Sequence, residues 1–264
     1  MTDIALSELL DQVEQIALEA GNAILEIYGR EFTVEEKEDK TPLTEADKAA
    51  NSIILAGLEA LPVDIPVLTE EAVEAFTGAD RQGRYWLVDP LDGTKEFIKR
   101  NGEFTVNIAL IEQGQPVLGV VFAPALNVTY LGAENVGAFK VDGAGERQPI
   151  KVVEHQAGTP WRVVGSRSHA SQDTLDWLKA LGDYELVPMG SSLKICLVAE
   201  GVADVYPRLG PTCLWDTGAA HAVVSAAGGR LTTLDGTHLD YGSPETVLNP
   251  WFVVCAAPIS STLQ

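Results

Sequence analysis

The sequence predicts a layered α/β fold in which helices cover both faces of sheet. Two helical patterns open the chain, and short apolar runs bounded by Gly, Pro, Asn or Asp follow them. Beyond residue 160 strand and helix patterns alternate, which is typical of layered packing. The 264 residues, 46% apolar and 21% charged, suffice for a sizeable core in one large domain or two small ones.

The first half of the chain is expected to hold two helices followed by a sheet. Apolar residues recur every three or four positions over 7–28, with Ser7 as the cap, and again over 49–58, after the segment 44–47. Gly114 lies between two apolar runs at hairpin distance, so part of the sheet should be antiparallel. Strands are expected at 67–68, 85–88, 105–111 and 117–122, with further short strands over 127–142.

The second half is expected to alternate strands and helices. A Gly-rich, polar passage over 142–160 separates the halves, and we place a boundary near residue 150. This gives two lobes, residues 1–150 and residues 151–264, which together form one compact unit. The expected elements are a strand at 161–165, a helix at 172–181, a helix opening at Ser191, a strand at 204–206 and a helix at 215–227.

The charge is strongly and unevenly acidic. The chain has 38 acidic and 18 basic residues, a net charge of −20. Residues 1–150 hold 27 acidic and 11 basic residues (net −16), whereas residues 151–264 hold 11 and 7 (net −4). A protein of this charge, without a basic run, lacks the electrostatic features of a nucleic-acid or anionic-membrane binder.

Targeting and cysteine patterns favour a cytoplasmic protein with free thiols. The N-terminal residues are acidic and do not resemble a signal peptide, and the longest apolar stretch, 117–126, is too short to span a bilayer. Cys196, Cys213 and Cys255 are odd in number, widely separated and without C-x-x-C spacing. We therefore expect buried thiols and neither a disulfide framework nor a zinc site.

The most informative segment is an apolar strand pattern that ends in two carboxylates, Asp89 and Asp92. They are expected to straddle a turn, so that both carboxylates and the Leu91 carbonyl can converge on one point. Three hard oxygen donors within four residues suit Mg²⁺. The alternative is an ordinary turn, because Asp, Pro and Gly all favour turns.

Two other segments bring acidic residues to comparable positions. Glu70 and Glu71 follow a short apolar run, and Asp216 lies at the start of a predicted helix. Alone, the glutamates would be interpreted as a solvated loop, and Asp216 as a residue stabilised by the helix dipole.

Together these segments resemble the inositol monophosphatase superfamily of lithium-sensitive, Mg²⁺-dependent phosphatases. The resemblance runs nearly end to end and implies a five-layer α/β/α/β/α sandwich of the inositol monophosphatase and sugar phosphatase type. Three motifs in the right order are far more specific than a single one. These three motifs are Asp89-Pro-Leu-Asp-Gly-Thr94, Glu70-Glu71 and Trp215-Asp-Thr-Gly-Ala-Ala220, and the segment Thr44-Glu-Ala-Asp47 matches as well. The resemblance implies that residues 1–150 form a metal-binding lobe and residues 151–264 a substrate-binding lobe of one catalytic unit.

The resemblance also implies roles for individual residues. Thr94 and Glu70 would orient and deprotonate the attacking water, and Asp47 would act through water at a further, weaker metal position. Four carboxylates in one cleft would repel each other without cations, so metal is expected to stabilise the fold. The implied ligands of two or three Mg²⁺ ions are Glu70, Asp89, Asp92, Asp216 and the Leu91 carbonyl.

Within the superfamily, two segments of the second half, 165–169 and 189–194, resemble the 3′(2′),5′-bisphosphate nucleotidases, as does 85–109. This implies removal of the 3′-phosphate from adenosine 3′,5′-bisphosphate, with 3′-phosphoadenylyl sulfate as a second substrate. Hydroxyl, imidazole and ammonium donors would hold the 5′-phosphate. The implied substrate contacts are Ser166, Ser168, His169, Gly190, Ser191 and Lys194, together with Glu70, Leu91, Asp92, Gly93, Thr94 and Asp216.

Several alternatives stay open. Each of these serines, His169 and Lys194 alone is more often a turn, cap or solvated residue. Inositol phosphate or fructose 1,6-bisphosphate could be the substrate, or the protein could be a non-catalytic metal- or nucleotide-binding regulator. Arg167 and Arg208 suit either phosphate binding or the surface, and the acidic segment 31–39 suits either a mobile loop over the metals or a solvated linker. The sequence also leaves open a monomer or homodimer and a peripheral location at the cytoplasmic face of the inner membrane.

Overall fold

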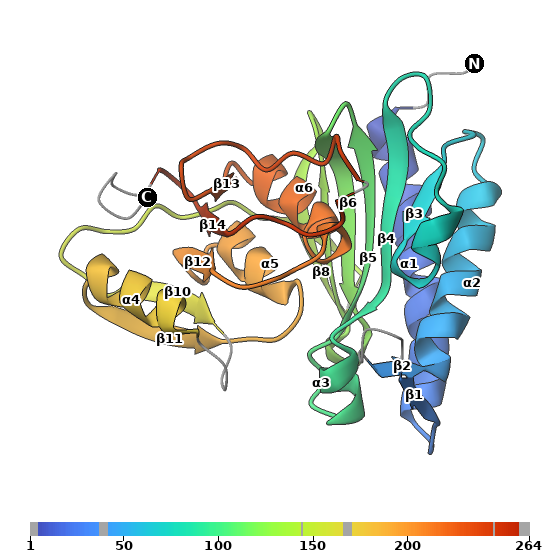
Figure 1. Ribbon diagram of the computed structural model, residues 1–264, viewed down its shortest axis with the longest axis horizontal. Coiled ribbons are helices and arrows are strands. Elements are labelled where there is room, and N and C mark those ends of the chain that lie inside the picture. Colours follow the sequence, from blue (N-terminus) through green and yellow to red (C-terminus); the bar gives the residue numbers. More distant parts are fainter. Residues whose placement is uncertain (1–4, 37–41, 144, 166–170, 245, 259–264) are drawn as a thin grey trace.

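The computed structural model describes residues 5–36, 42–143, 145–165, 171–244 and 246–258, and these fold into five layers (Figure 1). Helices α1 (Leu6–Tyr28) and α2 (Glu45–Glu59) form the first layer, against a seven-stranded sheet. Helices α5 (Leu193–Ala199) and α6 (Gly218–Ala226) lie between this sheet and a five-stranded one. Helix α4 (Gln172–Leu181) covers the outer face of the second sheet. The expected α/β/α/β/α arrangement is confirmed.

The seven-stranded sheet has the order β3-β4-β5-β6-β7-β8-β9 and is antiparallel except between β3 and β4. Gln113 and Gly114, both at positive φ, connect β5 to β6 in the hairpin expected from the sequence. The strands are β3 (Val67–Thr69), β4 (Arg84–Asp92), β5 (Thr105–Glu112), β6 (Gln115–Ala123), β7 (Val128–Ala133), β8 (Gly137–Asp142) and β9 (Arg147–Pro149).

The segment between α1 and α2 differs from expectation. Strand β1 (Val34–Glu36) pairs with β2 (Pro42–Thr44) in an antiparallel ribbon, so part of the acidic segment 31–39 is a strand and not a linker. Residues 37–41 lie outside the described part of the chain. The expectation that Ser7 caps α1 is wrong, because the helix begins at Leu6 and Ala5 is its cap residue.

The five-stranded sheet has the order β11-β10-β12-β14-β13. Sequence periodicity missed β11, β13 and β14, since β11 is an exposed edge strand and the other two have only four residues each. The helix expected over 215–227 is divided into a 3₁₀ turn, Leu214–Asp216, and α6. The strands are β10 (Trp161–Gly165), β11 (Tyr184–Pro188), β12 (Val205–Arg208), β13 (Arg230–Thr233) and β14 (Phe252–Cys255).

Helix α6 lies in backbone contact with the seven-stranded sheet because glycines face it. A Cβ atom at Gly119 would lie 2.1 Å from the carbonyl oxygen of Ala219, and one at Gly132 would lie 2.5 Å from the Cα of Val223. These approaches fix α6 over β6 and β7. They also fix the position of Asp216, which precedes α6, relative to β4.

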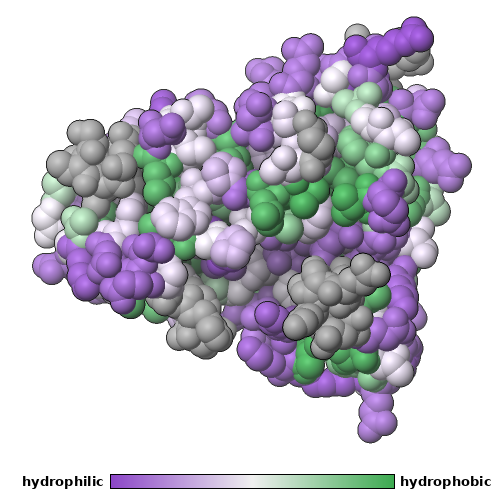
Figure 2. All heavy atoms as spheres, viewed as in Figure 1, coloured by the Kyte–Doolittle hydropathy of each residue, from purple (hydrophilic) through white to green (hydrophobic). Residues whose placement is uncertain are grey.

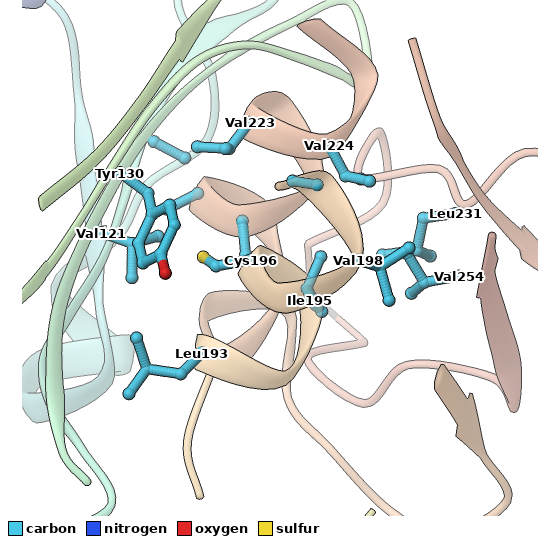
Figure 3. Close-up of a cluster of buried hydrophobic side chains, with 14 of the residues drawn as sticks. Val121, Tyr130, Leu193, Ile195, Cys196, Val198, Val223, Val224, Leu231 and Val254 are labelled. Atoms are coloured by element: carbon cyan, nitrogen blue, oxygen red, sulfur yellow. The ribbon is translucent and has the colours of Figure 1, made fainter. Parts of the chain in front are cut away.

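The core consists of apolar side chains on both faces of the seven-stranded sheet. Figure 3 shows the cluster around α5, with the Cys196 sulfur directed towards Tyr130. Cys196 and Cys255 are buried and form no disulfide, as expected, whereas Cys213 is half-buried.

The surface is mixed in polarity. Hydrophilic residues dominate the outer edges of the face in Figure 2, whereas hydrophobic residues gather nearer the middle. None of the helices in the described part of the chain is both long and apolar enough to span a membrane.

Candidate active site

The acidic motif lies at the carboxyl end of β4. The strand continues through Pro90 and Leu91 to Asp92, with an irregular register against β5 between Asp89 and Asp92. The expectation that the strand ends in a turn at Asp89 is therefore wrong, because a β-bulge re-aims these side chains while the pairing with β5 continues. Leu91 donates its N–H to Asp89 Oδ1 at 3.0 Å.

Gly93 lets the chain leave β4 and begin α3 (Thr94–Ile98). It has a φ of 92°, and a Cβ atom there would lie 3.0 Å from the Glu103 carbonyl oxygen. The Thr94 hydroxyl, at the first position of α3, lies 3.3 Å from Asp47 Oδ1 and 3.4 Å from the Leu91 carbonyl oxygen. The structure thus brings Thr94 together with two of the predicted site residues.

Asp47 is buried at the start of α2. Its Oδ2 accepts hydrogen bonds from the Thr44 N–H (2.7 Å) and the Thr44 hydroxyl (2.6 Å), which form part of a capping box. Its Oδ1 is left to face Thr94. Helix capping therefore fixes the orientation of this carboxylate.

Three carboxylates from two distant segments, the end of β4 and the 3₁₀ turn before α6, meet in one cluster. Asp89, Asp92 and Asp216 each present an oxygen such that these atoms lie within 4.8 Å of one another. Each carboxylate also accepts a hydrogen bond from one backbone N–H, and its remaining oxygen lone pairs can coordinate a cation. The donors are Leu91 to Asp89 (3.0 Å), Ser192 to Asp92 (2.5 Å) and Cys213 to Asp216 (2.8 Å).

The electrostatics of the cluster favour bound positive charge. Burial, and then the charge of Asp92, raise the pKa of Asp216 to about 8. Burial raises the pKa of Asp92 to about 6, against the opposing effects of the Lys194 charge and the Ser192 N–H. Burial and the neighbouring carboxylates, Glu70 first among them, raise the pKa of Asp89. Glu70 begins the 3₁₀ turn Glu70–Ala75 after β3 and so faces this cluster.

A cleft of about 300 Å³ extends from the cluster towards α5, and Lys194 and Arg208 contribute positive charge to it. Helix α5 begins at Leu193, so the expectation that it opens at Ser191 is wrong and Lys194 lies in its first turn. Ser191 has a φ of 46°, and its carbonyl oxygen accepts a bond of 2.6 Å from Lys194 Nζ. The predicted residues that line the cleft are Asp92, Gly93, Gly190, Ser191, Lys194 and Asp216.

Sequence reasoning missed Ser192. Besides its bond to Asp92, its hydroxyl lies 2.9 Å from that of Thr105 and 2.8 Å from Asn107 Oδ1. It stands beside Ser191 in a segment already singled out, so the signal was present. Three other predicted residues, Ser166, Ser168 and His169, lie outside the described part of the chain, as does Arg167, for which the sequence left both alternatives open.

The comparisons with known proteins agree with this geometry. The sequence model of the inositol monophosphatase family matches residues 5–259. The 3′(2′),5′-bisphosphate nucleotidase CysQ of Salmonella typhimurium is 52% identical over 248 residues, which cover 93% of this chain and 99% of that protein.

Solved structures are similar over nearly the whole chain. The crystal structure of CysQ from Bacteroides thetaiotaomicron has a TM-score of 0.80 and 38% identity, covering 95% of this chain and 98% of that one. The inositol monophosphatase from Anabaena has a TM-score of 0.77 and 25% identity, covering 98% of this chain and 94% of that one. The chain therefore belongs to the inositol monophosphatase family, whose members are metal-dependent phosphatases.

Proposed function

We propose that this protein is a Mg²⁺-dependent phosphomonoesterase that hydrolyses the 3′-phosphate of adenosine 3′,5′-bisphosphate to AMP and phosphate. The observation that carries the proposal is one cleft in which Asp92 and Asp216, from the acidic cluster, face Lys194 and Arg208. Such a cleft offers a metal-binding end and a cationic end to a molecule with two phosphates. Relatives named for this nucleotidase activity, about half identical over nearly their full length, support it.

The same proposal includes 3′-phosphoadenylyl sulfate as a second substrate and the recycling of a by-product of sulfate assimilation. The cytoplasmic location and the monomeric or homodimeric state stay predictions from the sequence.

The described residues fit a hard divalent cation. The cluster offers only oxygen donors, and burial makes its uncompensated negative charge costly. We assign two or three Mg²⁺ ions to it, and Asp47 to a further, weaker position reached through water. When bound, such ions neutralise charge on the phosphate and on the attacking and leaving oxygens. The proposed ligands are Glu70, Asp89, Asp92, Asp216 and the Leu91 carbonyl.

The attacking water would be held by Thr94 and Glu70. The Thr94 hydroxyl has Asp47 Oδ1 and the Leu91 carbonyl as acceptors, which leaves its oxygen lone pairs to accept from water. The carboxylate of Glu70 is the proposed acceptor of the water proton. The capping box that fixes Asp47 would keep the Thr94 hydroxyl oriented.

The 5′-phosphate would bind at the cationic end of the cleft. Lys194 and Arg208 are the proposed cations, Lys95 also lines the cleft, and Ser166, Ser168 and His169 are further proposed contacts that lie outside the described residues. A larger cavity of about 810 Å³ shares Lys194, Tyr206 and Arg208 with the cleft and is otherwise lined mainly by apolar residues of β10, α4, β11 and the segment 207–211. It offers space for the nucleoside.

The experiment is a substrate panel: phosphate release from adenosine 3′,5′-bisphosphate, inositol 1-phosphate and fructose 1,6-bisphosphate, with Mg²⁺ and with or without lithium. We expect the nucleotide to be hydrolysed fastest and lithium to inhibit in roughly the millimolar range, since it replaces one cation at an oxygen site. Asp92→Asn should abolish hydrolysis while the fold is retained.

Each alternative has its own outcome in this panel. Faster turnover of inositol 1-phosphate would overturn the nucleotide assignment. Binding of the nucleotide without turnover of any substrate would identify a non-catalytic regulator, although the intact set of Glu70, Asp89, Asp92, Thr94 and Asp216 argues against it.

A further inference from the structure

Thr217, which directly follows Asp216, is buried and sits at the centre of a hydrogen-bond network. Its hydroxyl donates to the Leu214 carbonyl (3.0 Å) and accepts from the Tyr241 hydroxyl (3.0 Å) and from Asn249 Nδ2 (3.1 Å). A hydroxyl group has one donor and two acceptor positions, so Thr217 uses its whole capacity.

Tyr241 connects this network to β4 and α6. Because its hydroxyl donates to Thr217, His221 must donate from Nδ1 to the same oxygen, which lies 3.1 Å away. The Tyr241 carbonyl in turn accepts from the Tyr85 hydroxyl at 2.8 Å. The strand that carries Asp89 and the turn that carries Asp216 are thus joined behind the acidic cluster.

Asn249 contacts the turn around Asp216 through both its side chain and its backbone. Its Nδ2 lies 2.6 Å from the Cys213 carbonyl and 3.2 Å from the Thr212 hydroxyl, in addition to its bond to Thr217. Its N–H donates to the Thr212 carbonyl at 2.9 Å, so the chain near Asn249 runs alongside the residues that lead into Asp216. One side chain therefore bridges the residues before and after Asp216.

The Asp216 carboxylate needs such support, because it has a single described hydrogen bond of its own, from the Cys213 N–H. It must also stay close to two other carboxylates that repel it. If the backbone turn were not fixed, this repulsion would move the Asp216 carboxylate away from those of Asp89 and Asp92.

We propose that Thr217, Tyr241 and Asn249 are positioning residues that hold Asp216 in place for metal binding. The proposal rests on the metal-dependent reaction proposed above and concerns residues for which no role was expected from the sequence. They act through the backbone on either side of Asp216, so their loss should weaken metal binding more than substrate binding. Removing partners that orient ligand residues typically costs about 10- to 100-fold in metal affinity.

The test compares Thr217→Val, which keeps the shape and removes the hydroxyl, with Thr217→Ser, which keeps the hydroxyl. Mn²⁺ binding is measured by electron paramagnetic resonance without substrate. The melting temperature of each metal-free variant is measured as well. We expect Thr217→Val to weaken Mn²⁺ binding by about 10-fold or more and Thr217→Ser to bind nearly as the parent does. At saturating Mg²⁺ the KM for the nucleotide should change little.

A second pair of variants controls for loss of stability, and it also serves as the test if the Thr217→Val protein does not fold. Tyr241→Phe and Tyr130→Phe each remove one hydroxyl from a buried tyrosine, the second of which is labelled in Figure 3. The Tyr130 hydroxyl, however, bonds to Glu200 at the end of α5. Only Tyr241→Phe should weaken Mn²⁺ binding. Parental Mn²⁺ binding by Thr217→Val, or equal weakening in both tyrosine variants, would overturn the proposal. Since Mn²⁺ binding needs no substrate, a failure of the nucleotidase assignment would leave this result unchanged.

Discussion

The backbone N–H of Ser192 donates to Asp92 Oδ2 at 2.5 Å, and this bond joins the acidic cluster on β4 to the start of α5. Lys194 lies two residues further along the same segment. A shift at the start of α5 would therefore displace both a clustered carboxylate and a cleft cation. The acidic cluster and the cationic side chain of Lys194 are mechanically connected at Ser192.

Replacing Ser192 by Ala should reduce both stability and substrate affinity. The variant leaves the buried Thr105 hydroxyl and Asn107 Oδ1 without their shared partner, at a cost of about 1–3 kcal/mol in unfolding free energy. Urea denaturation and KM for the bisphosphate measure the two effects. Ser52→Ala is the control, because that exposed hydroxyl bonds only to the Lys48 carbonyl of its own helix. Equal stability of the two variants would contradict the prediction.

Replacing Lys194 by Met should raise KM for the bisphosphate by about 10-fold or more, because a charge-assisted bond to phosphate is lost. Steady-state kinetics at saturating Mg²⁺ measure this. Lys179→Met is the matched control, since Lys179 is exposed and pairs with Asp176 at the surface. If inositol 1-phosphate turnover suffered as much as nucleotide turnover, Lys194 would not be a contact for the second phosphate.

The metal-free protein should lose stability as the pH rises from about 7 to 8.5. Asp216 has a pKa raised to about 8, whereas an unfolded aspartate is already ionised in this range. In this range the folded state binds more protons than the unfolded state. Raising the pH therefore lowers the free energy of unfolding, by up to roughly 1.4 kcal/mol per pH unit for one such group. His221, whose pKa is lowered to about 3 by burial, has the opposite effect, but only at lower pH. Thermal unfolding in EDTA across this range measures the slope.

Saturating Mg²⁺ should raise the melting temperature and remove this slope, because the cation binds the ionised carboxylates. Asp216→Asn should flatten the slope in EDTA without added metal. A melting temperature unchanged between EDTA and Mg²⁺ would count against the metal site as a whole.

Substituting Gly119 by Ala should destabilise the protein by about 1–3 kcal/mol or more and lower its activity. The added Cβ would lie 2.1 Å from the Ala219 carbonyl, so α6 must move away from β6, and Asp216 with it. Gly29→Ala is the control, since Gly29 has a φ of −72° and its Cβ would lie 3.5 Å from the nearest atom. Chemical denaturation and phosphate release measure the two effects, and activity retained at parental stability would show that α6 tolerates the shift.

Much of the fold can be predicted from the periodicity of apolar residues. Most of the elements that could not be predicted lack such a periodicity. The layered order could be predicted because α1, α2 and the strands from β4 to β6 carry clear apolar patterns. Strand β11 could not, because it is an exposed edge strand whose side chains do not alternate between buried and exposed. The residue types around Asp89 do not distinguish a bulge from a turn, because both structures favour the same residues.

The acidic residues of the site were predictable because three motifs stand in a specific order, and the structure brings Asp89, Asp92 and Asp216 together. Thr217 lies within one of these motifs, but no role was expected for its hydroxyl, and Asn249 lies outside all of them. Their significance depends on a backbone pairing between segments far apart in the sequence, and a hydroxyl or amide side chain does not reveal such a pairing.

The contact between Asn249 and the turn at Asp216 also determines when the site can form. Asp89 and Asp92 are synthesised well before Asn249, the residue that holds the turn around Asp216. A nascent chain thus exposes a strand end with clustered negative charge before its third carboxylate can be fixed. Metal capture by the complete cluster should therefore wait until the segment around Asn249 has been synthesised and has folded.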